Sequence, residues 1–227
     1  MRSVTKPPLR RWAPNRVWVL YAAGLAPALY NFYLGATGSL GADPVNTFEL
    51  DLGLWAVRFL ILALAVSPLR EIFGVNFIRY RRALGLLCFY YALMHLLTYL
   101  VLDQRLMLSE ILADVSKRPF TMLGAAAFVM LVPLALTSNT FSIRRLGKAW
   151  LRVHRLIYLI AICGAFHFAL ATKVLSGEQY LYLTLIVLLL AHRPLRPYLK
   201  RTRVRSAAPP RVRGQTLPRL AGPRPLD

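Results

Sequence analysis

The feature that most constrains this chain is a series of long apolar stretches in which charged residues are rare. They occupy residues 17–35, 52–69, 83–102, 119–136, 151–172 and 179–194. A helix needs about 20 predominantly apolar residues to cross a bilayer, and only the last stretch, with its core YLYLTLIVLLLA, is clearly short of that. The pattern therefore predicts an all-α integral membrane protein with a six-helix transmembrane bundle.

The charges between these stretches predict how the chain is oriented. Lys and Arg are concentrated before the first stretch, between the second and third, between the fourth and fifth, and after the sixth. The other connections are poor in cations or, at 103–118, mixed in charge. Because cationic segments stay in the cytoplasm, both termini are expected to be cytoplasmic, which also supports the sixth crossing. The net charge of +20 then reflects topology, and we expect no nucleic-acid partner.

The same pattern divides the chain into three segments. Residues 1–16 form a basic cytoplasmic N-tail, and residues 17–200 form the six-span domain. Residues 201–227 are rich in Arg and Pro, so we expect a disordered basic cytoplasmic tail that meets membrane lipid. The sequence has no Walker or GxGxxG motif, and no soluble nucleotide-binding domain fits beside the spans.

Histidines inside the spans are the candidate functional residues, because an ionisable group in a bilayer is costly unless it has a role or a partner. His95 lies twelve residues beyond Ala83 in the third stretch, and His167 lies thirteen residues beyond His154 in the fifth. At 1.5 Å per helical residue, these steps place His95 and His167 at about 18 and 20 Å from the cytoplasmic side, at similar depth. For any single histidine, a hydrogen bond between helices remains the alternative.

Two imidazoles at one depth on two helices can bind a heme iron from both sides. The sequence has no CxxCH motif, so the expected cofactor is heme b rather than a covalently attached heme. Bis-imidazole ligation leaves no open position on the iron, which suits electron transfer. We therefore predict His95 and His167 as the metal ligands of a transmembrane electron carrier.

Three further polar residues have open interpretations. His154 lies near the cytoplasmic face and is a candidate cofactor ligand for a second redox station, although the third stretch offers no histidine at that level. His192 is a possible partner there, but its HRPLRP context favours an ordinary interfacial residue. Arg58 lies in the outer third of the second stretch, where it either extends to the interface or pairs with a heme propionate.

Several motifs together resemble the MsrQ (formerly YedZ) family. They are LWAVRFLILALAVSPLR, RRALGLLCFYYALMHLLTYLVLD, KRPF, PLALTSN and IRRLGKAWLRVHRLIYL, followed by His167. The resemblance covers about 52–173 and, more loosely, the whole six-span body. Members of this family are similar to the transmembrane domain of ferric reductases and NADPH oxidases, which carry paired histidines on the third and fifth helices. The step from His154 to His167 fits the pair on the fifth helix, whereas the third helix has His95 alone.

The resemblance implies a pathway. MsrQ is the heme-binding subunit of a bacterial periplasmic protein-methionine-sulfoxide reductase system, located in the inner membrane. Electrons would come from a cytosolic flavin reductase, a bound FMN or quinol. The acceptor would be the periplasmic molybdopterin subunit that reduces methionine sulfoxide, so this chain would transfer electrons rather than carry out that reduction.

Two alternatives remain, and the second belongs to another functional class. One is a ferric reductase-like cytochrome b that reduces a small acceptor at the outer face. The other is a non-redox membrane transporter or scaffold, whose histidines are structural or carry protons. The presence of heme separates either cytochrome from the transporter.

Overall fold

The computed structural model describes residues 15–207, except for the side chains of residues 15, 193 and 196–207. Most of the predicted N-tail and residues 208–227 lie outside this part. Among the described residues all regular elements are helices, without a strand, which confirms the all-α prediction for them. The contacts divide the chain into residues 1–192 and residues 193–227. The boundary predicted at residue 200 falls within a helix that extends to Ala207.

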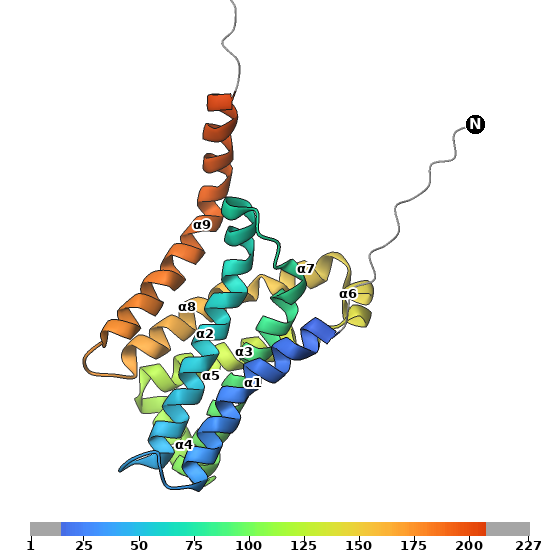
Figure 1. Ribbon diagram of the computed structural model, residues 1–227. Coiled ribbons are helices and arrows are strands. Elements are labelled where there is room, and N and C mark those ends of the chain that lie inside the picture. Colours follow the sequence, from blue (N-terminus) through green and yellow to red (C-terminus); the bar gives the residue numbers. More distant parts are fainter. Residues whose placement is uncertain (1–14, 208–227) are drawn as a thin grey trace, which may run out of the picture. The chain divides into compact units, whose positions relative to one another are not determined.

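The elements follow one another as shown in Figure 1. They are α1 (Asn15–Ala36), α2 (Pro44–Phe73), a 3₁₀ turn (Ile78–Tyr80), α3 (Arg81–Thr98) with a π-helical turn (Tyr99–Asp103), α4 (Leu108–Lys117), α5 (Pro119–Leu136), α6 (Thr140–Leu146), α7 (Lys148–His154), α8 (Leu156–Leu170) and α9 (Gly177–Ala207).

Five helical segments in the described part are long and apolar enough to cross a membrane. They are Arg16–Ala36, Pro44–Phe73, Ile78–Asp103, Pro119–Leu136 and Lys148–Leu170. The sixth predicted span corresponds to Gly177–His192, an apolar helix shorter than the other five. The chain is thus a multi-pass membrane protein, whereas the count of six crossings and the orientation of the termini stay predictions.

Local sequence signals explain where the long helices begin and end. Pro44 occupies the first turn of α2, and the Asp43 side chain caps that turn by accepting a hydrogen bond from the Asn46 backbone N–H at 3.1 Å. Gly74 ends α2 in the left-handed region, with φ of 71°. The fifth predicted span is not one uninterrupted α-helix, because a tighter turn at Arg155 separates α7 from α8.

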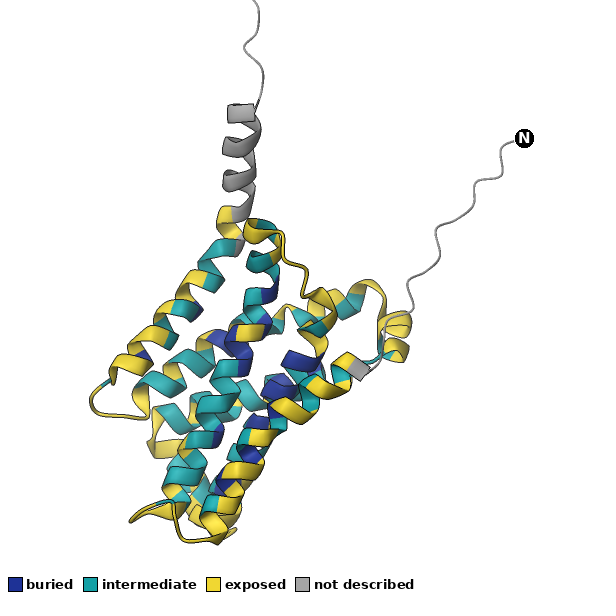
Figure 2. Cartoon of the chain, in the orientation of Figure 1, coloured by how far each residue is buried: buried dark blue, intermediate teal, exposed yellow. Residues whose placement is uncertain are grey.

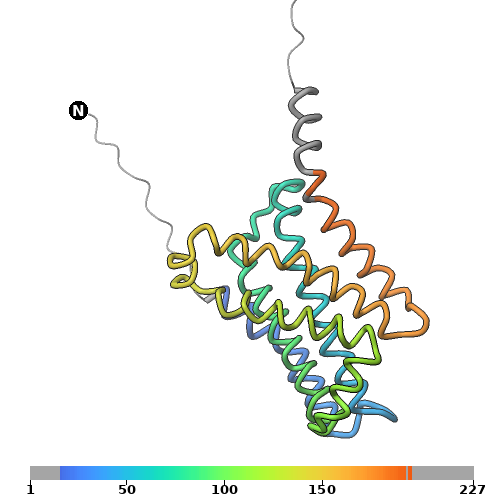
Figure 3. The backbone as a smooth tube through the Cα atoms, turned by 180° about the vertical axis from the view of Figure 1, so that it is seen from behind, coloured from blue at the N-terminus to red at the C-terminus, as the bar shows by residue number. Residues whose placement is uncertain are grey.

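The core of residues 15–192 is built from two helix pairs, α2 with α3 and α5 with α8, and α3 also contacts α5. The tube in Figure 3 shows α5 and α8 running side by side. Buried residues, dark blue in Figure 2, are concentrated on α2 and α3. Leu52 of α2 and Leu87 and Tyr91 of α3 are fully buried. Large apolar side chains on the outward faces are exposed, as expected for helices that face lipid.

Tyr91 joins α3 to α1 through two buried hydrogen bonds. Its hydroxyl donates to the Gly24 carbonyl at 2.8 Å and accepts from the Ala28 N–H at 3.1 Å. These two backbone groups are four residues apart in α1, so the hydroxyl lies between helical groups that would otherwise pair with each other. Because the ring is 0% exposed, water cannot substitute for the hydroxyl.

Replacing Tyr91 with Phe should lower the free energy of unfolding by about 0.5–1.5 kcal/mol, because both contacts to α1 are lost. Thermal unfolding of the purified protein in detergent measures the change. Tyr90→Phe is the matched control, since Tyr90 is exposed on the same helix. Equal effects of the two substitutions would contradict the assigned role of the Tyr91 hydroxyl.

Candidate functional site

The structure brings His95 of α3 and His167 of α8 together. Their ring centroids are 6.0 Å apart, and the ring planes make an angle of 72°. The two residues are far apart in the sequence, and the similar depth predicted for them agrees with this proximity. Both rings are partly buried between helices rather than turned toward the exposed outer faces.

Each of these imidazoles is fixed by one backbone carbonyl of a neighbouring helix. His95 Nδ1 lies 2.9 Å from the Glu49 carbonyl oxygen of α2, and His167 Nδ1 lies 2.7 Å from the Phe120 carbonyl oxygen of α5. A carbonyl oxygen can only accept, so Nδ1 must carry the hydrogen in both rings. A neutral imidazole then has its free lone pair on Nε2. This is the arrangement of metal-ligating histidines, whose second nitrogen donates to a carbonyl or carboxylate.

The spacing of the two rings fits one metal ion between them. With metal–nitrogen bonds of about 2.0 Å and ring atoms about 1.1 Å from the centroid, two imidazoles on opposite sides of one ion have centroids about 6.2 Å apart. The observed 6.0 Å is close to that value. Among the described residues no group of three or more His, Cys, Asp and Glu side chains is placed to hold a bare metal ion. Two imidazoles alone suit heme iron, since the porphyrin supplies the other ligands.

His154 is held apart from this pair, at the end of α7. Its Nδ1 lies 3.2 Å from the Trp150 carbonyl oxygen, and its ring stacks on the Trp150 indole with centroids 3.8 Å apart. The indole nitrogen in turn donates to the Thr137 carbonyl at 3.0 Å. His192 Nε2 lies 4.0 Å from Glu71 Oε2 of α2. Among the described residues, no hydrogen bond or ring contact joins His154 to another histidine.

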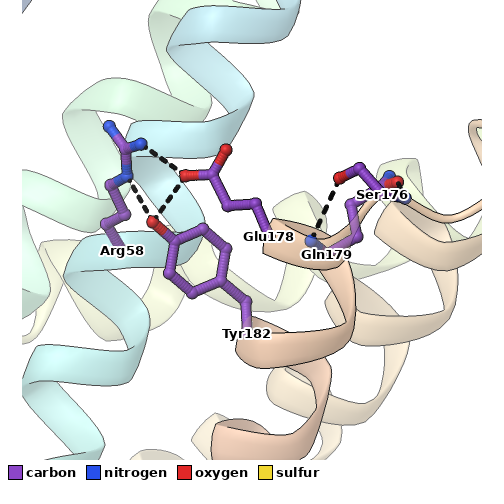
Figure 4. Close-up of polar contacts among 5 residues, drawn as sticks. All are labelled: Arg58, Ser176, Glu178, Gln179 and Tyr182. Carbon is purple, nitrogen blue, oxygen red and sulfur yellow. Dashed lines mark hydrogen bonds and ion pairs between the residues drawn. The ribbon is translucent and has the colours of Figure 1, made fainter.

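Arg58 has protein partners that the sequence analysis did not identify. Its Nη2 donates to Glu178 Oε1 at 2.8 Å and its Nε donates to the Tyr182 hydroxyl at 2.9 Å, as Figure 4 shows. Tyr182 also donates to Glu178 at 2.8 Å, and the guanidinium lies 4.6 Å from the centre of the Trp55 ring. This network ties α2 to the first turns of α9. The alternation of cation-rich and cation-poor connections puts the connection before α9 on the outer side of the membrane, the side on which Arg58 is predicted to lie. This shared side was the available signal in the sequence.

Comparison with known proteins matches residues 52–165 to a family described as the ferric reductase like transmembrane component. The match includes Arg58, His95 and His154 and ends before His167. Two relatives are named protein-methionine-sulfoxide reductase heme-binding subunit MsrQ. That of Rhizobium meliloti (strain 1021) is 54% identical over 211 residues, covering 93% of this chain and 97% of the relative. That of Brucella ovis is 54% identical over 185 residues, covering 82% and 84%. No solved structure matches the chain.

The Arg58 network predicts energetic coupling between α2 and α9. Arg58→Leu and Glu178→Gln should each lower thermal stability in detergent, and the double variant should lose less than the sum of the two losses. The Arg58 and Glu178 side chains are 29% and 48% exposed, so we expect a coupling energy below about 1 kcal/mol. Additive losses would show that the ion pair does not join the helices.

The same variants test the propionate role predicted for Arg58. The two hydrogen bonds leave donors on Nη1 for another acceptor. Loss of a propionate partner should lower the heme midpoint potential in Arg58→Leu but leave it unchanged in Glu178→Gln. If a redox titration gives the wild-type midpoint for both variants, Arg58 serves only the contact with α9.

Proposed function

The chain belongs to the MsrQ family, and we propose that it transfers electrons across the bacterial inner membrane on heme b ligated by His95 and His167. The observation that carries this proposal is the pair of imidazoles 6.0 Å apart, each with Nδ1 held by a backbone carbonyl. The MsrQ relatives are named heme-binding subunits, which supports the same cofactor.

Each residue of the site has a definable task. His95 and His167 would hold the iron through their Nε2 atoms, and bound heme would supply reversible one-electron chemistry. The Glu49 and Phe120 carbonyls hold both rings in the Nδ1–H tautomer and fix their orientation. Two fixed imidazoles leave no coordination position for oxygen or water. The residues thus favour transfer of electrons over chemistry at the iron.

The proposed orientation follows from the loop charges: six crossings with both termini in the cytoplasm. In that orientation His95 and His167 lie in the outer half of the bilayer and His154 lies near the cytoplasmic face. We propose His154, stacked on Trp150, as a second redox station where electrons enter. Such a station would shorten a transfer path of roughly 20 Å along the helix axis.

The partners are proposed from the names of the relatives and from the family resemblance. The acceptor would be a periplasmic molybdopterin-containing subunit that reduces methionine sulfoxide in oxidised proteins. The donor would be a cytosolic flavin reductase or quinol, with FMN as a possible bound intermediate. In this assignment the chain is an electron-transfer subunit and the catalytic site lies on the partner.

The match to the ferric reductase like family favours one second candidate, a cytochrome b that reduces a small acceptor such as a ferric chelate. The rate at which the reduced protein is reoxidised in vesicles distinguishes the MsrQ-type function from the ferric reductase function. Rapid reoxidation by the purified catalytic partner and slow reoxidation by ferric chelates support the MsrQ-type function. The opposite order of rates supports the ferric reductase function.

Protein purified from heme-replete cells should show a low-spin b-type spectrum that shifts on reduction. His95→Ala and His167→Ala should each remove the same heme component, and the double variant should lose little more, because both ligands serve one iron. His154→Ala should keep that component and slow its reduction from the cytoplasmic side. A folded but colourless wild-type protein would exclude the function, and loss of different components in the two single variants would exclude the pairing.

Thiol labelling tests the proposed crossing by α9. In a variant with Cys88 and Cys163 replaced by Ser, single cysteines at Val174 and Leu195 flank the apolar part of α9, and both positions are exposed. A membrane-impermeant maleimide applied to spheroplasts should label Val174→Cys and leave Leu195→Cys unlabelled until lysis. Labelling of both before lysis would show that α9 does not cross.

A further inference from the structure

The two histidines are held by the same local arrangement on two different helices. His95 donates to the carbonyl of Glu49, and the residue four positions later in α2 is Gly53. His167 donates to the carbonyl of Phe120, and the residue four positions later in α5 is Gly124. In both cases the glycine lies directly against the imidazole that the carbonyl holds.

Helix geometry explains how a glycine at this spacing makes room for an imidazole ring, which is bulkier than the Tyr91 hydroxyl that reaches the Gly24 carbonyl beside Ala28. The carbonyl of a helical residue accepts the N–H four residues later, and it keeps a second lone pair for another donor. Side chains tilt toward the helix N-terminus, so the Cβ of the later residue lies over that carbonyl. A residue without a Cβ leaves the second lone pair open to a side chain from another helix.

The distances show how little room there is. An ideal Cβ on Gly53 would lie 3.2 Å from His95 Nδ1 and 3.3 Å from Cε1. An ideal Cβ on Gly124 would lie 2.7 Å from His167 Nδ1 and 2.8 Å from Cε1. The His95 ring would have to shift by a few tenths of an ångström, whereas beside Gly124 the His167 ring or the α5 backbone would have to shift further.

We propose that Gly53 and Gly124 are positioning residues of the heme site, which seat the two imidazoles on the Glu49 and Phe120 carbonyls and direct both Nε2 atoms toward one iron. The proposal rests on the proposed function, because it assigns these residues to the same heme. Nothing in the motif resemblance or in the names of the relatives assigns them this role.

The chain supplies matched controls for both substitutions. Gly85 lies in α3 with His95 and Gly164 lies in α8 with His167, and a Cβ at either position would meet nothing within 4 Å. Alanine is a better helix former than glycine, so Gly85→Ala and Gly164→Ala should be neutral or stabilising. Gly24→Ala is a third control, because the three atoms nearest to its Cβ would all belong to the Leu87 side chain, the first at 2.6 Å, so the substitution would disturb packing away from the histidines.

Heme titration of the heme-depleted protein gives the first measurement. Overpacking beside His167 should weaken heme affinity roughly 5- to 100-fold in Gly124→Ala, with a smaller loss in Gly53→Ala. Electron paramagnetic resonance of the oxidised protein gives a spectroscopic signature, since the largest g value depends on the angle between the imidazole planes. Gly53→Ala should keep heme with a shifted g value, while Gly85→Ala, Gly164→Ala and Gly24→Ala keep the wild-type signal.

Nitrogen NMR of the histidines in the heme-depleted protein gives a measurement that does not need heme. His95 and His167 should carry hydrogen on Nδ1 in the wild type, and Gly124→Ala should lose that tautomer at His167 alone. Wild-type affinity, g value and tautomers in both Gly53→Ala and Gly124→Ala would overturn the proposal, as would equal losses in Gly24→Ala. Suppose that the wild type shows both Nδ1–H tautomers, that Gly124→Ala loses the one at His167, and that the wild type takes up no heme. The positioning of the two imidazoles by Gly53 and Gly124 is then supported, and the proposed function fails.

Discussion

Hydrocarbon offers no hydrogen bonds, so each polar group placed within the membrane needs a partner from the protein itself. Among the described residues, no buried side-chain nitrogen or oxygen lacks one. Tyr91, His95 and His167 all meet this requirement in the same way, by bonding to the backbone of a neighbouring helix. These contacts join α3 to α1, α3 to α2 and α8 to α5. The need to satisfy polar groups therefore holds the bundle together and also orients the two imidazoles.

Much of the fold was predictable because its determinants are local. Long, mainly apolar stretches predicted the long helices, and the helix rise predicted the similar depth of His95 and His167, which the structure places in contact range. The comparisons confirm the family that the motifs resembled. The break at Arg155 was not predicted, because a single tightened turn inside an apolar stretch changes neither composition nor periodicity.

The remaining parts of the site depend on pairs of segments that no local pattern connects. Arg58 was read as extending to the interface or meeting a propionate, yet Glu178 and Tyr182 from α9 surround it. Gly53 and Gly124 gave no signal, because glycine is frequent in membrane helices and its meaning here depends on a ring from another helix. The family match ends at residue 165, so the geometry, rather than that match, brings His167 into the site.

Each histidine and its carbonyl belong to one pair of packed helices: α2 with α3 for His95, and α5 with α8 for His167. Residues 44–98 contain all of the first arrangement and residues 119–170 contain all of the second. Neither half needs the other to orient its ring. During synthesis the N-terminal half can therefore present a finished ligand before the C-terminal half has left the ribosome, and bringing the two halves together becomes the step that creates the complete cofactor site.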